Sequence, residues 1–516
     1  MLAIAVALLL GAGVRAQTLR IGVQGDAGTM DPHAHIIATT VTLQSMVYET
    51  LVTRDRLLQL APGLAVRWET ADAATWRFHL RPDVRFHDGA PFTAADVEFS
   101  IRRAQEPTSQ FQIFASTIRE IRVVDPLTVE LVTSRADPLL ADKLARIFIM
   151  SRSWAQQHDV ARPQNLNERQ ETFASLNADG TGPFILRSRV PDTRTVLERN
   201  PRYWASLQSN VARVEWVPVA NGPTRVAALV SGELDIVIDV PPQDTAWLSD
   251  ASDLKVERTD EFRTIAFGFD HASAQLRYGQ PGIGNPFRDR RVREAIYRAI
   301  DIAAIQRATM RGLATPTGQL LAPGNFGYDR TLDARPPYDP AGARRLLAAA
   351  GYPNGFAFTL DCPNDRYAND EQVCRAVTTM LTQAGLGVTL NALPRARYFP
   401  KIVQRDTSMF LVGLDSPLFD GVYALEALYM TPGGAEGFAN SGSYSDPELD
   451  RMIRAARDEI DRPRRAALLR DAWQRAREEI AYVPMYHQVL VWAMRRNVDT
   501  VQRPDNQFEI RWTRVN

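Results

Sequence analysis

The sequence predicts a multi-lobed α/β protein with mixed sheets, and three observations support this. The chain has 516 residues, whereas a single hydrophobic core stops growing at about 250–300 residues. Hydrophobic residues make up 45% and charged residues 23% of the chain, which is typical of a folded protein. Segments with the periods of strands and of helices are interspersed along the chain, without strict βαβ alternation.

The first half of the chain carries the clearest strand patterns. Residues 75–81 alternate between apolar and polar side chains, which predicts a half-buried strand. Thr93 and Asp96 have the spacing of a capping box, so we expect a helix with Thr93 as its N-cap. Residues 127–131 and 234–238 alternate in the same way and predict two further strands.

The second half is richer in helical patterns. Apolar residues at helical spacing predict a helix over 292–299. The Asp-Pro pair at 339–340 predicts a helix start, and Gly351 predicts its end. A second Asp-Pro pair, at 446–447, predicts another start. The Arg-rich residues 449–480 predict a long helical stretch whose alternating charges form a solvated face.

Charge and motif content exclude several classes of function. The 60 basic residues equal the 60 acidic residues in number, which argues against a nucleic-acid partner, because phosphate neutralisation requires a basic excess. None of the three lysines follows a glycine, so there is no GxxxxGK[ST] phosphate loop. The motifs GxSxG, HExxH and GxGxxG are also absent. We therefore expect a binding protein that is not an enzyme and needs no cofactor.

Histidines offer two weak candidate sites. His33 and His35 would share one face of a strand and could ligate a metal with Asp31, but a polar loop is the favoured interpretation. His87 and Asp88 could form a dyad, although a turn before the helix explains them better. We therefore predict no metal site.

The first 16 residues resemble a secretory signal. Residues 2–10 form an unbroken apolar stretch, and residues 14–16 provide a small-residue cleavage site. The stretch is too short to span a bilayer, which takes about 20 residues. The usual basic start is missing, so either the start lies further upstream or the signal is weak; a buried terminal strand is the alternative. Cleavage would leave Gln17 first, without the cysteine of a lipoprotein.

The chain has two cysteines, Cys362 and Cys374. A close pair in an exported protein can form a disulfide, and two free buried thiols are the alternative. The spacing is not CxxC, so the pair indicates neither a redox motif nor a zinc knuckle.

Residues 61–97 resemble the signature of family 5 extracellular solute-binding proteins, which are the receptors of dipeptide, oligopeptide and nickel ABC importers. Further segments match the family in order, so that the resemblance extends from about residue 20 to the C-terminus. They are residues 28–32, 47–51, 181–184, 199–204, 231–235, 290–295, 444–450 and 483–486.

The resemblance implies a type II periplasmic binding protein fold, with two lobes around a ligand cleft and an extra third domain. Lobe I would be discontinuous and would combine residues 17–60, 180–265 and 486–516. Residues 61–179 would form the extra domain II, and residues 266–485 would form lobe III. The lobes would close on a hinge around the ligand.

The same resemblance implies capture of di- or oligopeptides in the periplasm. A monomer would deliver the peptide to an ABC permease and its ATPase. A second interpretation keeps the family but changes the ligand to a nickel chelate, glutathione, an opine or an oligosaccharide. A secreted hydrolase is the remote alternative, because the chain lacks the motifs named above.

Candidate ligand-binding residues follow from the family's site. Asp420, in residues 413–421, resembles the aspartate that binds the ligand ammonium, with Asp415 as the fallback. This segment departs from the family pattern, having Leu414 where a tryptophan is frequent and Gly421 where a proline is frequent; a plain Asp-Gly turn is the alternative. An arginine should bind the ligand carboxylate.

Arg366 is the candidate for that carboxylate, because it lies where dipeptide receptors have an Arg-bearing loop. The Cys362–Cys374 bond would brace this loop, and a solvated arginine is the alternative. Four more residues are expected at the cleft, namely Thr29, Met30, Tyr48 and Asn440.

Overall fold

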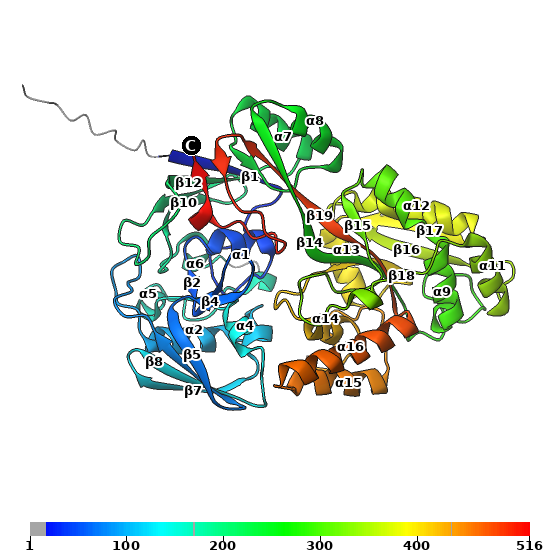
Figure 1. The fold of residues 1–516 in the computed structure, drawn as a ribbon, viewed down its shortest axis with the longest axis horizontal. Coiled ribbons are helices and arrows are strands. Elements are labelled where there is room, and N and C mark those ends of the chain that lie inside the picture. The colour runs from blue at the N-terminus through cyan, green and yellow to red at the C-terminus, as the bar shows by residue number, and fades with distance from the viewer. Residues whose placement is uncertain (1–16, 169–170, 435) are drawn as a thin grey trace, which may run out of the picture.

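The computed structural model describes residues 17–168, 171–434 and 436–516, and the predicted signal over residues 1–16 lies outside them. One large mixed sheet runs through the molecule (Figure 1). Its strands, in spatial order, are β10 (Phe184–Val190), β11 (Arg194–Arg199), β12 (Val211–Pro218), β1 (Gln17–Val23), β13 (Ile236–Val237), β19 (Tyr482–Arg495), β14 (Leu254–Phe269), β18 (Met409–Leu414), β16 (Ala357–Pro363) and β17 (Gly387–Leu393), with β15 (Ala314–Pro316) paired to β19.

Strands β14 and β19 connect the two halves of the molecule. They form a long antiparallel pair that crosses diagonally between the halves in Figure 1. The register of this pair shifts between Asp260 and Thr264, as at a β-bulge, where a strand bends and its twist increases. An irregularity in two strands that run through both halves of the described structure is a suitable place for a hinge.

The N-terminal half also carries a smaller antiparallel sheet. Its strands are β5 (Ala65–Asp72), β6 (Thr75–Leu80), β8 (Thr128–Thr133) and β7 (Ile118–Asp125), in that order. The helices of this half are α1 (Ala38–Gln44), α2 (Ala94–Ala104), α3 (Gln112–Ala115), α4 (Leu140–Leu144), α5 (Arg152–Gln157), α6 (Phe173–Leu176), α7 (Gly222–Ser231) and α8 (Thr245–Asp250).

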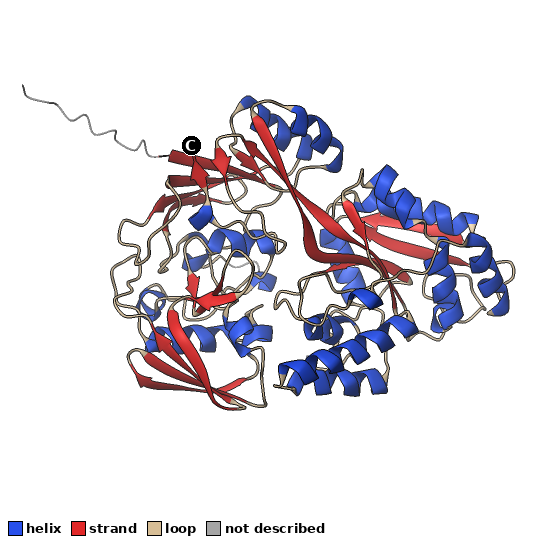
Figure 2. Cartoon of the chain, in the orientation of Figure 1, coloured by secondary structure: helices blue, strands red, loops and turns tan. Residues whose placement is uncertain are grey.

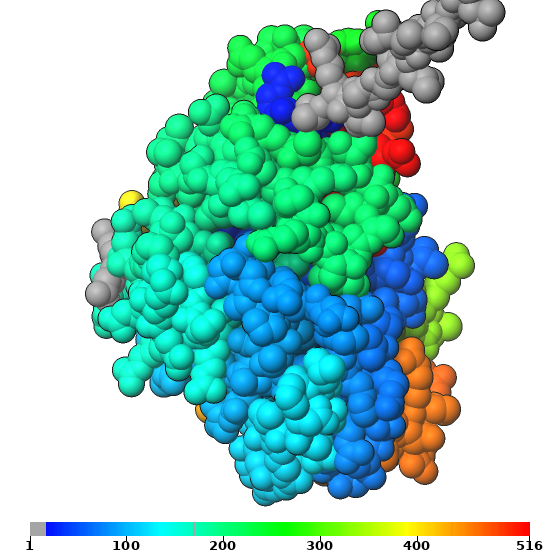
Figure 3. Space-filling model, turned by 90° about the vertical axis from the view of Figure 1, so that its left-hand side faces the viewer, coloured from blue at the N-terminus to red at the C-terminus, as the bar shows by residue number. Residues whose placement is uncertain are grey.

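Short two-stranded pairings complete this half. They are β2 (Glu49–Thr50) with β9 (Phe148–Ile149), β3 (Val52–Arg54) with β4 (Leu60–Pro62), and β20 (Val498–Asp499) with β21 (Arg514–Val515). One continuous hydrophobic core joins the smaller sheet to β1 and to the C-terminal residues. In Figure 3 the blue and cyan segments lie directly against the green segment above them, in agreement with this shared core.

The C-terminal half is a three-layered α/β unit. Figure 2 shows its strands between groups of helices, and two separate apolar clusters pack there. Its helices are α9 (Arg290–Ala299), α10 (Ile302–Ala304), α11 (Pro340–Ala349), α12 (Asp370–Gln383), α13 (Arg395–Val403), α14 (Gly421–Leu428), α15 (Pro447–Asp458) and α16 (Arg462–Glu479). We propose that the three predicted lobes follow these sheets, with β14 and β19 as the connections between lobe I and lobe III.

Most of the local patterns fold as predicted. Strand β6 covers the alternating residues 75–80, and Val129 and Leu131 are buried in β8. Thr93 and Asp96 form both hydrogen bonds of the capping box at the start of α2. Helix α9 contains the predicted residues 292–299, α11 begins at the predicted Asp-Pro pair, and Gly351, just beyond α11, has a left-handed φ of 95°. Such a φ is accessible to glycine without the steric cost that a Cβ would impose.

Two predictions need correction. The expected strand over 234–238 is reduced to the two residues of β13, between β1 and β19. The Arg-rich segment forms two helices, α15 and α16, because Asp461 is a new N-cap and Pro463 lies in the first turn after it. The face of α16 is also not wholly solvated, since Arg465 is 4% exposed. Arg465 therefore needs a partner inside the protein.

Candidate functional site

A cavity of about 100 Å³ lies between the two halves of the molecule. Phe419 of lobe III enters it, while the rest of its lining comes from the N-terminal half and from the chain's C-terminal segment. The guanidinium of Arg54 lies 4.2 Å from the centre of the Phe419 ring, which is a cation–π distance. This cavity is the candidate ligand cleft, because ligand sites occur preferentially between domains.

Four arginines line the cavity, and three of them are neutralised within the protein. Arg54 pairs with Asp142 at 2.6 Å, Arg503 with Asp505 at 2.7 Å, and Arg511 with Glu509 at 2.8 Å. The fourth is Arg146, for which the described residues provide no carboxylate within ion-pair distance. Burial lowers the pKa of Arg146, whereas Asp505 and Asp415 act in the opposite direction.

Glu49 is the remaining acid of the cavity lining. Its carboxylate accepts hydrogen bonds from the hydroxyls of Thr181 and Tyr203 and from the indole of Trp204, at 2.7–2.8 Å. Burial raises its pKa, although these donors act against the shift. Its oxygens are thus satisfied by lobe I itself, which makes Glu49 a structural carboxylate.

Asp420 occupies the N-cap of α14 and is engaged on all sides. Its carboxylate oxygens lie 2.5 and 2.8 Å from the two terminal nitrogens of Arg465, and one also accepts the backbone N–H of Val422. The residue is 3% exposed. Contrary to the sequence-based expectation of a free carboxylate, this group already has its cation, so a ligand ammonium would have to displace Arg465.

Asp415 follows directly after β18 and is open to solvent. Its side chain is 52% exposed, and its nearest cation is Arg263, 3.9 Å away. Arg263 belongs to the irregular part of β14 and pairs with Glu261 at 3.1 Å. Burial raises the pKa of Glu261 to about 7, with Arg263 acting in the opposite direction. The hinge strand and the end of β18 therefore bring three charged groups together.

Arg366 lies in the loop between β16 and α12. The loop is held by the Cys362–Cys374 bond, which joins the end of β16 to α12. Asp370 accepts the backbone N–H groups of Arg366 and Tyr367. The guanidinium of Arg366 lies 5.0 Å from the Tyr367 ring centre and has no carboxylate partner among the described ion pairs. Burial lowers its pKa, and Arg263 contributes in the same direction.

Tyr367 ties this loop to the strand that precedes Asp415. Its hydroxyl accepts the backbone N–H of Gly413 at 3.0 Å and lies 3.3 Å from the carbonyl oxygen of the same residue. Gly413 is required for this contact, because a Cβ there would lie 2.6 Å from the tyrosine ring. Asp415 acts to raise the pKa of Arg366, so the two groups lie within electrostatic range of each other, although neither lines the cavity.

The other four candidates are buried. Thr29 and Met30 have no exposed surface, and the Thr29 hydroxyl accepts the N–H of Asp31. Asn440 is 1% exposed and is fully bonded to Met430 and Tyr444 backbone groups. Tyr48 is also buried but lines the cavity. Of these four, the structure brings only Tyr48 to the cleft wall.

The histidine pairs have structural partners. His33 is fully buried, with Nε2 2.8 Å from the Phe148 carbonyl oxygen and Nδ1 3.2 Å from Arg103. His87 lies 2.9 Å from the Gly182 carbonyl oxygen, in the turn before α2. Within residues 17–168, 171–434 and 436–516, no cluster of three His, Cys, Asp or Glu side chains could hold a metal.

The sequence-based prediction did not include Arg146, Phe419, Glu261 or Arg263. Phe419 has a left-handed φ of 55°, a conformation that is uncommon for a bulky residue and that no sequence pattern indicates. The arginines had no distinguishing signal, because arginine is the dominant basic residue of the whole chain.

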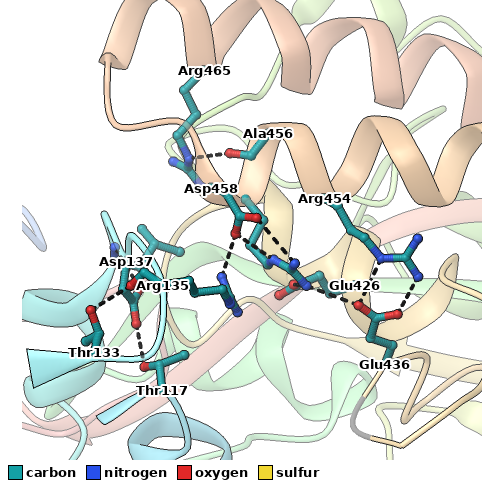
Figure 4. Close-up of polar contacts among 12 residues, drawn as sticks. Thr117, Thr133, Arg135, Asp137, Glu426, Glu436, Arg454, Ala456, Asp458 and Arg465 are labelled. Atoms are coloured by element: carbon teal, nitrogen blue, oxygen red, sulfur yellow. Dashed lines mark hydrogen bonds and ion pairs between the residues drawn. The ribbon is translucent and has the colours of Figure 1, made fainter. Parts of the chain in front are cut away.

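Lobe III also contacts domain II directly, outside the cavity. Figure 4 shows Arg135, from the segment after β8, beside Asp458 at the end of α15. The Arg135 Nη1 atom donates a hydrogen bond of 2.7 Å to Asp458 Oδ1. Arg457 also pairs with Asp458, at 2.9 Å. In the part of the chain that the structure describes, no helix is both long and apolar enough to cross a membrane.

Comparison with known proteins agrees with this architecture. Glutathione-binding protein GsiB of Salmonella paratyphi A is 25% identical over 492 residues, covering 94% of this chain and 91% of that protein. The periplasmic binding protein DppA of Helicobacter pylori, solved with the peptide STSA, superposes with a TM-score of 0.82 at 20% identity, covering 97% and 98% of the two chains. A dipeptide-binding protein of Pseudoalteromonas sp. SM9913, solved with Met-Leu, gives 0.80 at 21% identity, covering 97% and 100%.

The family model "Bacterial extracellular solute-binding proteins, family 5 Middle" matches residues 59–436, which is well over half of the chain. The family's members are ligand-binding components of ABC importers. The match includes the smaller antiparallel sheet, strand β14, Arg366 and Asp415. The mixed α/β fold agrees with this match, and the chain belongs to family 5 of the bacterial extracellular solute-binding proteins.

Proposed function

We propose that this protein captures di- or oligopeptides in the periplasm and delivers them to the permease and ATPase of an ABC importer. The observation that carries the proposal is the pair of charged groups that lobe III leaves available, namely the exposed carboxylate of Asp415 and the guanidinium of Arg366, which has no carboxylate partner among the described ion pairs. A peptide has one ammonium and one carboxylate terminus, and closing a cleft removes water, so each terminus needs a partner.

In this proposal Arg366 binds the ligand carboxylate and Asp415, in place of Asp420, binds the ammonium. Arg366 can form two parallel hydrogen bonds to a carboxylate. Asp415 is preferred over Asp420 because its ion pair with Arg263 is long, at 3.9 Å, whereas Asp420 holds Arg465 at 2.5 Å. Tyr48 contributes to the opposite wall. Thr29, Met30 and Asn440 support the cleft from behind, since their side chains are buried.

We further propose a cycle in which lobe III rotates about β14 and β19. The Arg135–Asp458 pair and the Arg54–Phe419 contact form when the lobes meet. The protein would be exported with cleavage after residue 16, would act as a monomer and would perform no chemistry on its ligand. Ligand specificity would then depend on the groups that the closed cleft leaves unpaired.

A second candidate keeps this mechanism with a non-peptide or modified-peptide ligand. The relative GsiB is described as glutathione-binding, and a structure with a TM-score of 0.81, AgaA, contains agropinic acid. The unpaired Arg146 favours this candidate, because a simple peptide terminus at Arg366 leaves the second arginine without an anion.

The first test is native mass spectrometry of the protein, exported with its own leader and purified without denaturation. We expect additional masses that fragment as short peptides or peptide derivatives. The same sample after unfolding and refolding is the control, since it should lose these masses. A metal isotope pattern, or a ligand without any amino or carboxyl group, would contradict the proposed roles of Arg366 and Asp415.

A further inference from the structure

Leu418 of lobe III is buried in the hydrophobic core of the N-terminal half. It is 5% exposed and belongs to the apolar cluster that joins the smaller sheet to β1. The other described members of this cluster come from residues 19–238 and 492–515. Tyr423, in the first turn of α14, is partly buried and packs against the same cluster. Two side chains of lobe III therefore extend the core of the opposite half.

Leu139 makes the reverse contact from domain II. It is partly buried and packs against both the N-terminal cluster and the lobe III cluster of α14, α15 and α16. Asp137 holds this segment, because it accepts hydrogen bonds from the Leu139 N–H at 3.2 Å and from the side chains of Thr117 and Lys143 at 2.6 Å. Figure 4 shows Thr117 bonded to Asp137 on the domain II side. Leu139 is thus presented to lobe III by a segment that domain II itself fixes.

Hydrogen bonds also fix the loop that carries Leu418. The Ser416 hydroxyl accepts the Asp420 N–H at 3.2 Å and donates to the Asp420 carbonyl oxygen at 2.8 Å. The carbonyl oxygen of Phe419 accepts the N–H of Phe326 at 2.9 Å. Phe419 has a left-handed φ of 55°, a conformation that a bulky residue keeps only where the surrounding structure enforces it. The bonds that hold the loop all lie within lobe III, so the loop can keep its shape when the lobes separate.

Charged groups of opposite sign lie beside this apolar contact. Arg135 of domain II pairs with Asp458 of lobe III at 2.7 Å, and both side chains are partly exposed. Burial raises the pKa of Glu426 in α14, whereas Lys143 and Arg135 are among the charges that lower it. Domain II therefore presents cations where lobe III presents carboxylates. Such complementarity guides two surfaces into one register.

We infer that Leu139, Leu418 and Tyr423 form an interlobe contact that favours closure of the lobes independently of the ligand. The inference rests on the hinge motion of the proposed function and adds a source of closure outside the cavity. None of the three is among the described residues that line the cavity. A leucine that is buried only when the lobes meet favours the closed arrangement by roughly tenfold or more.

The interlobe contact should act on every ligand alike. A residue that touches the ligand changes the affinity for some ligands more than for others. A contact between the lobes instead changes the population of the arrangement that binds, so all affinities change by one factor. The closed arrangement should also be populated before a ligand arrives, and a ligand then shifts the remaining molecules toward it.

The test is a distance measurement by pulsed electron paramagnetic resonance on the mature protein, freed of ligand by unfolding and refolding. Spin labels at Val123→Cys in domain II and Ile460→Cys in lobe III report the separation of the lobes. Both positions are exposed, at 44% and 58%, and the native cysteines are bonded to each other. We expect a shorter and a longer distance in the otherwise wild-type protein. Leu418→Ala should raise the ratio of the longer to the shorter at least about threefold.

Two further variants separate closure from stability. Leu276→Ala is the matched control, because Leu276 is 6% exposed and packs in a cluster within lobe III. It should lower the thermal stability and keep the wild-type distances. Leu139→Ala removes a side chain that is only partly buried, so it tests the inference even if Leu418→Ala does not fold. It should shift the distances in the same direction as Leu418→Ala, by a smaller amount.

Calorimetry with glutathione and with trialanine gives the second readout. Leu418→Ala should weaken every probe that binds by one common factor of about three- to tenfold. A loss for one probe alone would show that Leu418 acts on the ligand and would contradict the inference.

The outcomes keep the inference apart from the proposed function. If the ligand-free wild type shows only the longer distance, or if Leu418→Ala and Leu139→Ala leave the distances unchanged, the inference is wrong while ligand capture stands. If neither probe binds and no compound copurifies with the protein, the proposed function fails. The distances in the ligand-free protein then still decide whether the interlobe contact controls closure.

Discussion

Asp415 and Asp420 are close together in sequence but belong to two charged regions that differ in their pairing. At the start of α14, Asp420 and Arg465 neutralise each other and are almost completely buried. In the second region, Asp415 is half exposed, and Arg366 and Arg146 have no carboxylate partner among the described residues. The first region has no charged group available to a ligand, whereas the second region has three such groups.

This difference teaches that the residue type alone does not identify a binding group in this protein. An aspartate at a helix N-cap that also holds a buried arginine contributes to stability, and its removal leaves an uncompensated charge. An aspartate beside an open cleft contributes to binding, since its charge is neutralised only when a ligand arrives. Substitutions in the two regions should therefore change different measured quantities.

The largest effect is expected for Asp420→Asn. The substitution leaves Arg465 buried without its counter-charge, so the free energy of unfolding in urea should fall by roughly 3–5 kcal/mol. The ligand affinity of the folded protein should change by less than about threefold. Asp415→Asn is the matched control, with the opposite pattern of near-normal stability and weakened binding. Equal stability of the two variants would contradict the distinction between the regions.

The next effect is expected for the double variant Cys362→Ser/Cys374→Ser. The bond closes a short loop with a sequence separation of 12, so its loss should lower the free energy of unfolding by roughly 2–3 kcal/mol in the chain-entropy model. Ligand affinity should also fall, because this loop positions Arg366. Reduction of the wild type with dithiothreitol should give the same shift. An unchanged affinity would show that the Arg366 loop does not depend on the bond.

The pH dependence of stability tests the charges at the hinge. The pKa of Glu261 is raised to about 7 in the folded protein, compared with about 4.3 for a free glutamate. The folded state therefore keeps a proton that the unfolded chain releases between these values, and stability falls as the pH rises through this window, by at most about 1.4 kcal/mol per pH unit.

In Glu261→Gln, the fall in the free energy of unfolding with rising pH should disappear without being reversed. The measurement is urea unfolding from pH 4.5 to pH 7.5, and the comparison is between slopes, because the variant also leaves Arg263 without its partner. Glu233→Gln, at an exposed glutamate, is the matched control and should keep the wild-type slope. If the free energy of unfolding of the wild type rises steadily from pH 4.5 to pH 7.5 relative to that of the variant, the raised pKa of Glu261 is contradicted.

The smallest effect is expected at the contact between the lobes outside the cavity. Arg135 and Asp458 are both partly exposed, and exposed pairs contribute at most about 1 kcal/mol. Arg135→Gln should therefore reduce ligand affinity by less than about fivefold, with no change in the unfolding of the free protein. The reduction should disappear at high salt, where an exposed pair is screened. A larger loss that persists in salt would show that this pair acts as more than a surface contact.

Local structure was predicted well where the sequence pattern that specifies it spans only a few residues. The capping box at Thr93 and Asp96, the alternation in β6 and the Asp-Pro start of α11 depend on backbone geometry over one or two turns. The break between α15 and α16 had such a signal in Asp461 and Pro463, which the prediction of one long helical stretch did not use.

The site was predicted only in part, for a physical reason. Arg366 and Asp415 were found through a family resemblance, and their roles as ligand-binding residues stay predictions; in the structure Arg366 has no carboxylate partner among the described ion pairs, and Asp415 is exposed. The primary choice of Asp420 overlooked Arg465, which is 45 residues away in sequence and was expected to face solvent. Whether a charged group already has a partner depends on contacts between distant segments, which no local pattern records.

The sequence by itself determined the family, the alternation of sheets and helices, and the loop and strand end that carry Arg366 and Asp415. These follow from motifs and from periodicities that act over short distances. Only the tertiary structure decided which charges are neutralised. It pairs Asp420 with Arg465, gives three cavity arginines their carboxylates and leaves Arg146 without one. That distinction is tertiary because charge pairing depends on distance in space, and the fold brings residues hundreds of positions apart to the same cleft.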